Sequence, residues 1–129
     1  MSRQINIVCV SGSHEKLQMA AMFASVSVAS GDKVTVFFSM NAITYFVKGN
    51  TEKPVAEGVF SKLLSKKGVP PFRQLFKMAV ELGDAQLLPC SMALDLMDIS
   101  EDELEPEFGP STGLTHFLSL SEGGELLTF

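Results

Sequence analysis

The chain has 129 residues and a formal net charge of −5, from ten Lys and Arg against fifteen Asp and Glu. This acidic balance argues against a nucleic acid as partner, because nucleic-acid binding surfaces are basic. No apolar window approaches the roughly eighteen residues of a membrane span, and the first residues lack the apolar core of a signal peptide. We therefore expect one cytoplasmic domain over residues 1–129, without a membrane span, and long enough to bury a core.

The first forty residues predict a strand, a helix and a second strand. Residues 4–10 form a β-rich run that we expect to be a strand buried on both faces, as in a parallel sheet. Residues 15–30 predict a helix, with Glu15 in its first turn and Gly31 at its C-terminal cap. This helix is apolar nearly all round, so we expect it to bury one side on the sheet and the other on a second subunit. Residues 33–39 predict the second buried strand.

The middle of the chain predicts helices separated by a loop. Residues 41–47 suit a short helix, and the polar stretch 48–53 suits a mobile loop. Residues 57–66 predict a helix with Val59, Phe60, Leu63 and Leu64 on one face. Proline is favoured in the first helical turn, so a further helix is expected over residues 71–83.

The remaining residues continue the alternation of strands and helices. We expect a strand over 85–90, a short helix over 91–97, a capping box at 100–103, a helix over 113–120 and a last strand over 125–129. Strands that alternate with helices predict an α/β fold, with a parallel sheet covered on both faces.

Cys90 is the strongest candidate for chemistry. It lies where a predicted strand meets a predicted helix, and the first N–H groups of a helix stabilise a thiolate, the reactive form of sulfur. In doubly wound sheets, ligands bind beyond the carboxyl ends of the strands, so we expect segments 11–14, 39–41 and 90–92 to line one crevice. The alternative is a buried structural cysteine, because cysteine is among the most often buried residues.

The other candidates have weaker signals. Cys9 lies mid-strand and suits packing. His14 could act as an acid, a base or an anion ligand, or be an ordinary exposed loop histidine. Ser11 is a weak ligand candidate, Ser91 flanks the thiol, and Met40 and Met92 either line a pocket for sulfur species or fill the core. No Cys/His spacing predicts a metal site, and we expect no cofactor.

Charge is unevenly distributed along the sequence. The last basic residue is Lys77, and eleven acidic residues follow it. Either one domain has two solvated faces, or a basic patch meets an acidic patch within the fold or between subunits.

Three segments resemble one known family. The sequence GDKVTVFFS at 31–39, KGVP at 67–70 and PCSMALDLM at 89–97 together are similar to the DsrE/DsrF-like family, in particular its stand-alone sulfur-carrier branch. The cysteine segment resembles the family's Cys-x-Met-x-Met-Asp-x-Met-Gly signature. It departs from that signature at Leu94 and Asp98, where the family usually has methionine and glycine, and Ser91 replaces a common glutamine.

The resemblance implies a flavodoxin-like three-layer fold with a mostly parallel sheet of four to five strands, without flavin. It also implies a homo-oligomer, a trimer or a hexamer. The implied function is a sulfur carrier or sulfurtransferase that holds sulfane sulfur on Cys90 as a persulfide or thiosulfonate, taking it from a sulfur donor and passing it to an acceptor thiol. The alternative is an oligomeric small-ligand or protein-binding module of the same fold, in which Cys90 is structural.

Overall fold

The computed structural model describes residues 2–129 and contains a four-stranded parallel sheet. The strands are β1 Gln4–Cys9, β2 Lys33–Phe38, β3 Gln86–Pro89 and β4 Glu125–Thr128, in the spatial order β3-β2-β1-β4. β1 and β2 pair in register from Gln4 opposite Lys33 to Cys9 opposite Phe38. The α/β class predicted from the alternation of strands and helices is confirmed.

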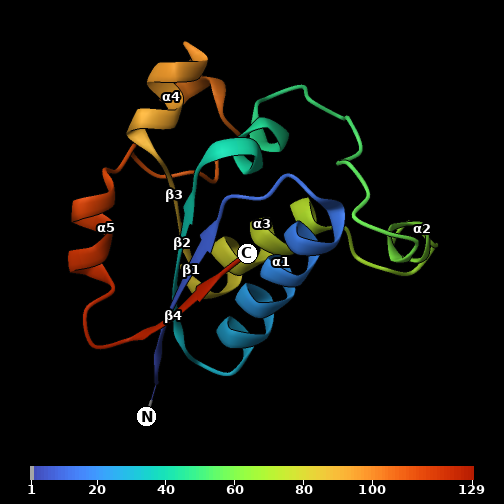
Figure 1. The fold of residues 1–129 in the computed structure, drawn as a ribbon. Helices are drawn as coiled ribbons and strands as arrows, with labels where there is room; N and C mark the ends of the chain where they lie inside the picture. The colour runs from blue at the N-terminus through green and yellow to red at the C-terminus, as the bar shows by residue number, and fades with distance from the viewer. Residues whose placement is uncertain (1) are drawn as a thin grey trace.

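Helices cover both faces of this sheet and its carboxyl end (Figure 1). They are α1 His14–Ala29, η1 Met40–Phe46, α2 Phe60–Leu64, α3 Phe72–Gly83, α4 Ser91–Met97, η2 Glu101–Glu103 and α5 Leu114–Leu120. α1 and α3 lie against one face, α5 lies on the other, α4 lies beyond the carboxyl ends of the strands, and α2 stands apart from the sheet. None of the helices within residues 2–129 has the length and apolar character that a membrane crossing requires.

α1 is capped at its start by Ser13, and Gly31, which the sequence analysis expected at its C-terminal cap, follows its end. The Ser13 side chain accepts a hydrogen bond from the backbone N–H of Lys16, and Gly31 follows the helix with φ +87°. A side chain at that φ would be strained, so glycine suits the turn into β2. One side of α1 is buried on the sheet. The opposite side exposes a second apolar stripe: Met19, Met22, Phe23 and Val26.

Phenylalanine rings fill the core beneath the carboxyl half of β2. Phe38 is fully buried, and its ring centroid lies 4.8 Å from that of Phe46, 5.1 Å from that of Phe76 and 4.9 Å from that of Phe108. These rings come from a strand, two helices and the segment before α5, so burying them joins distant parts of the sequence. The cluster supports the end of the sheet at which Cys90 lies.

α2 differs from its prediction in length and in orientation. The helix covers Phe60–Leu64 instead of residues 57–66, because the backbone N–H groups of Glu57 and Gly58 instead bond to the Glu15 carboxylate, at 2.8 and 2.7 Å. The sequence predicts an apolar face on this helix. In the structure Ser61 faces inward against the polar start of α1, and Val59 and Phe60 are 84% and 58% exposed.

Candidate functional site

Cys90 joins β3 to α4 and is held through its backbone on two sides. Its N–H donates to the Phe38 carbonyl oxygen of β2 at 2.8 Å, and its carbonyl oxygen accepts from Leu94 N–H in the first turn of α4. On the other side, Thr112 N–H donates to the Pro89 carbonyl oxygen, and Ser91 N–H donates to that of Thr112. The thiol therefore has a fixed backbone at the carboxyl end of the sheet.

Cys90 occupies the N-cap position of α4. Its backbone is extended, with φ −68° and ψ 121°, and its side chain makes no capping hydrogen bond. The positive end of the α4 dipole therefore lies at this residue. Cys90 is 5% exposed and belongs to the buried hydrophobic core.

Cys9 is the second free thiol and occupies a different environment. It is the last residue of β1, is 1% exposed, and lies opposite Phe38. Burial raises the pKa of the Cys9 thiol far above its ordinary value, because the charged form would lose its hydration. The packing role predicted for Cys9 agrees with this environment.

The expected single crevice is divided into two hollows. One, of about 390 Å³, brings Ser11 and Ser13 of the first loop together with Asn41 and Tyr45 of η1. Neither Cys90 nor Met92 lines it. The other, of about 350 Å³, is lined by Ser91 next to Cys90 and by residues of α4 and η2, among them Asp95 and Glu101.

The methionines predicted to flank the crevice are exposed and line neither of the two hollows. Met40 is 55% exposed with φ +54°, and Met92 is 52% exposed. Neither fills the core, in contrast to the packing alternative considered for them. Both remain candidates for contact with a bound sulfur donor.

His14 is buried, which corrects the expectation of an exposed loop histidine. It is the first residue of α1, it is 6% exposed, and its Nδ1 lies 2.6 Å from the Ser61 hydroxyl. Its backbone N–H donates to the Val55 carbonyl oxygen at 2.9 Å. The chain at 55–61 returns across the start of α1 and covers the ring, a long-range contact that the local sequence does not show.

Acidification is expected to weaken the attachment of α2. Burial, followed by the charge of Lys53, lowers the pKa of His14, so the unfolded chain binds more protons than the folded one. Stability is then complete above the ordinary histidine pKa and falls as pH drops through the lowered one. Urea unfolding between about pH 7.5 and about pH 5.5 should show this fall. His14→Gln should flatten the profile, whereas the exposed His116→Gln should leave it unchanged.

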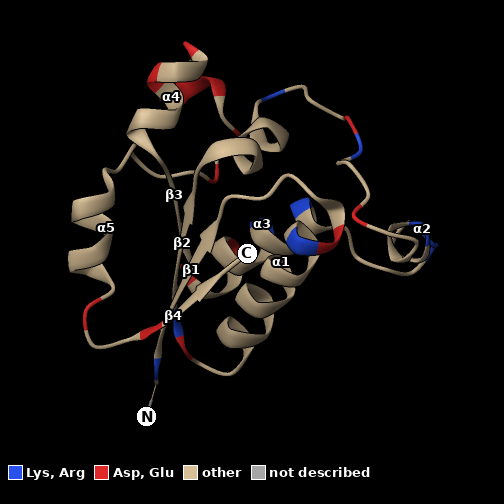
Figure 2. Cartoon of the chain, viewed as in Figure 1, with Lys and Arg blue, Asp and Glu red and all other residues tan. Residues whose placement is uncertain are grey.

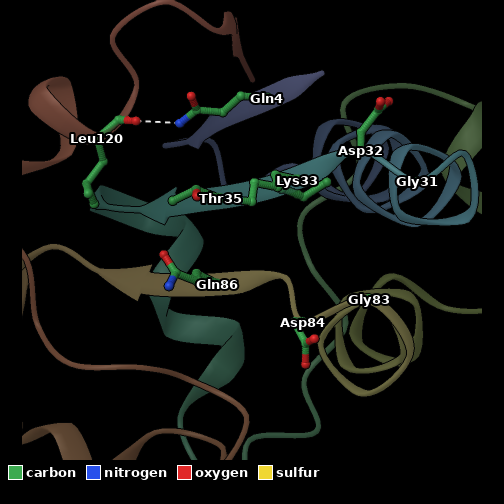
Figure 3. Close-up of a pocket in the computed structure, with 10 residues that line it drawn as sticks. Gln4, Gly31, Asp32, Lys33, Thr35, Gly83, Asp84, Gln86 and Leu120 are labelled. Atoms are coloured by element: carbon green, nitrogen blue, oxygen red, sulfur yellow. Dashed lines mark hydrogen bonds between the residues drawn. The ribbon is translucent and has the colours of Figure 1, made fainter. Parts of the chain in front are cut away.

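A polar hollow of about 420 Å³ lies at the opposite end of the sheet (Figure 3). Gln4, Thr35 and Gln86 line it from three neighbouring strands, and the Gln4 amide donates to the Leu120 carbonyl oxygen. The sequence analysis missed this hollow. The sequence feature that could have indicated this hollow is the alternation of polar residues in strands that are otherwise apolar, such as Gln4 and Asn6 in β1.

Titratable groups do not gather into a metal site within residues 2–129. Polar groups at the first-loop hollow are hydroxyls and an amide, which can orient a ligand but supply no strong nucleophile. Cys90 therefore combines a fixed backbone with a nucleophilic thiol at the N-cap of α4.

Fold and site together define a class: an α/β protein with a cysteine at the N-cap of the helix that follows β3. Residues 41–127 match the sequence profile of the DsrE/DsrF/DrsH-like family, and this span covers more than half of the chain. The chain belongs to that family, which is related to sulfur relay.

Two solved structures are similar to this chain over its whole length. MTH1491 from Methanobacterium thermoautotrophicum, described as a protein of unknown function, has a TM-score of 0.70 and 11% identity, covering 99% of this chain and 100% of its own. The ychN protein from E. coli has a TM-score of 0.70 and 15% identity, covering 100% of both chains. At these identities the likeness shows the fold. No curated protein matches the chain in sequence.

Proposed function

We propose that this protein is a cytoplasmic sulfur carrier that holds sulfane sulfur on Cys90 as a persulfide. The observation that carries the proposal is the position of Cys90 at the N-cap of α4 in a chain of the DsrE/DsrF/DrsH-like family. The cytoplasm suits this chemistry because a reducing compartment keeps thiols free, and both cysteines are thiols here.

The reaction is a sulfur exchange without net oxidation. The Cys90 thiolate attacks the outer sulfur of a persulfide donor, the S–S bond of the donor breaks, and the donor leaves as a thiolate. Cys90 then carries the outer sulfur and its proton as a persulfide. The thiolate of an acceptor attacks that outer sulfur in the same way, and Cys90 returns to its thiolate form.

Cyanolysis tests this proposal, because cyanide removes the outer sulfur of a persulfide as thiocyanate. The protein is incubated anaerobically with polysulfide, freed of excess reagent, and treated with cyanide. We expect about one thiocyanate per chain, as one reactive thiol predicts. A yield near zero from protein with an unchanged circular dichroism spectrum would contradict the proposal and favour a binding module with a structural Cys90.

We also propose that the protein forms a homo-oligomer through the outer face of α1. The exposed side chains Met19, Met22, Phe23 and Val26 follow the spacing i, i+3, i+4, i+7, which is typical of a helix packed against a second helix. The patch continues to the end of the chain just after β4, where the Phe129 ring lies 5.5 Å from that of Phe23. A second copy presents the same stripe and can cover it about a two-fold axis.

A charge in this stripe is expected to break the assembly. Val26 is 64% exposed, so Val26→Glu costs little in the isolated chain but would place an unpaired carboxylate in the interface. Sedimentation velocity should show the wild type as an oligomer and the variant at lower mass. Leu118→Glu is the matched control, because Leu118 is 51% exposed on α5, which lies on the other face of the sheet. An unchanged mass for Val26→Glu would exclude this face as the interface.

A further inference from the structure

A basic arm projects from the molecule between η1 and α3. We define the basic arm as residues 53–67, which include α2 and carry four lysines against one glutamate, a net charge of +3. All four lysines are exposed: Lys53, Lys62, Lys66 and Lys67. On the same projection Val59 is 84%, Phe60 58% and Leu63 42% exposed. The arm therefore combines positive charge with an uncovered apolar centre.

The arm is fixed to its own chain, although it stands apart from the sheet (Figure 1). The Glu15 carboxylate accepts from the N–H groups of Glu57 and Gly58, and Lys16 pairs with Glu57 at 3.5 Å. Ser61 is 1% exposed and is hydrogen-bonded to His14. A positioned arm loses little conformational freedom when it docks, so its apolar side chains form a ready binding surface.

An acidic face lies on the opposite side of the molecule (Figure 2). We define the acidic face as residues 92–103 on α4 and η2. It carries five exposed carboxylates and no basic residue: Asp95, Asp98, Glu101, Asp102 and Glu103. Its apolar side chains are uncovered too, with Leu96 79% and Met92 52% exposed.

The carboxylates of the acidic face lack a cationic side chain as partner. Among residues 2–129 the ion pairs are Arg3 with Asp32 and Lys16 with Glu57. The ammonium of Lys48 comes near this face, but it donates to the backbone oxygen of Asp102. The face therefore has five negative groups, of which Asp102 has its pKa lowered by hydrogen bonds and by the nearby charge of Lys48, and an exposed apolar centre.

Within one chain the two surfaces point away from each other, so they can meet only between copies. We propose that the basic arm of one copy docks on the acidic face of the next, with Phe60 and Leu63 against Leu96 and the lysines against the carboxylates. The two surfaces have opposite charge and similar apolar centres, which is the complementarity that such an interface requires. The contact is heterologous, so each copy can use its arm on one neighbour and its acidic face on another.

This contact would bring a second chain to the candidate site. The hollow beside Cys90 is lined by Ser91, Asp95 and Glu101, which belong to the acidic face or adjoin it. A lysine of the neighbouring arm placed there would offset the charge of Asp95 and favour the thiolate. The inference rests on the self-association proposed above and is independent of sulfur loading.

Charge reversal with rescue tests the contact. Lys62→Glu with Lys66→Glu reverses the charge of the arm, and Asp95→Lys with Asp98→Lys reverses that of the acidic face while keeping Leu96. Sedimentation velocity should show that each pair weakens assembly by about tenfold or more, because attraction becomes repulsion. All four substitutions in one chain should restore the wild-type mass. Lys33→Glu with Lys77→Glu changes the net charge equally outside the arm and should have no effect.

Two results would overturn the inference while leaving the α1 interface intact. One is a wild-type mass for the arm-reversed variant, and the other is a lower mass that the four-substitution variant fails to restore. A wild type that sediments as a monomer would overturn both interfaces. Thiocyanate yield reports sulfur loading separately, so failure of the sulfur proposal is distinguished from failure of the contact.

Discussion

Cys90→Ser is expected to abolish sulfur loading and to leave the fold intact. Serine has no sulfur to carry, and it is among the residues preferred at a helix N-cap, the position that Cys90 occupies in α4. Intact-protein mass spectrometry after anaerobic polysulfide treatment should show one added sulfur on the wild type and none on the variant. A thermal unfolding curve close to that of the wild type would show that the loss is chemical.

Cys9→Ser is the matched control for this experiment. Cys9 is 1% exposed and its pKa is raised by burial, so it contributes little thiolate and should carry no sulfur. The Cys9→Ser variant should therefore load like the wild type. Loading that survives in Cys90→Ser and disappears in Cys9→Ser would reverse the assignment.

Phe38→Ala is expected to lower the free energy of unfolding by about 3–5 kcal/mol, the usual cost of removing a fully buried aromatic ring. Phe38 is 0% exposed, and three other rings lie within 5.1 Å of its own, so the cavity cannot collapse without moving two helices. Its carbonyl oxygen also holds the N–H of Cys90. Urea denaturation measures the effect.

A surface substitution provides the reference for that loss. Leu82 on α3 is 76% exposed, so Leu82→Ala should change stability by no more than about 0.5 kcal/mol. A Phe38→Ala loss as small as that of Leu82→Ala would show that the aromatic cluster is not a main support of the fold.

The strands and the long helices could be predicted because their signals are local. β1 and β2 are runs of branched and aromatic residues, and α1 begins and ends at residues whose capping chemistry depends on their immediate neighbours. The position of Cys90 follows from the same signals, since it needs only the end of one strand and the start of one helix.

The surroundings of the site could not be predicted because they depend on contacts between distant residues. His14 is buried by Ser61, forty-seven residues away in the sequence, and α2 is shortened by a carboxylate of α1. The apolar face of α2 has the spacing of a core helix, yet it lies in solvent because Ser61 is the side chain that faces inward. Periodicity shows that such a face exists but does not show what covers it.

The expected single crevice is divided into two hollows for the same reason, because its shape depends on contacts between distant residues. The carboxyl ends of β1, β2 and β3 are neighbours, as the doubly wound pattern predicts. Gly12 nevertheless approaches η1 closely: a Cβ at this position would lie 3.0 Å from Asn41 Cβ and 3.3 Å from the Tyr45 ring. This packing forms a hollow at the first loop, whereas the hollow beside Cys90 is formed by α4 and η2.

Peptide mapping of the loaded wild type tests most directly whether Cys90 carries the sulfur. The chain has no lysine or arginine after Lys77, so trypsin places Cys90 in the peptide 78–129 and Cys9 in the peptide 4–16. After polysulfide treatment and alkylation of the native protein, we predict the additional sulfur in peptide 78–129, on Cys90. Sulfur in peptide 4–16, or in neither peptide of a folded protein, would contradict the assignment.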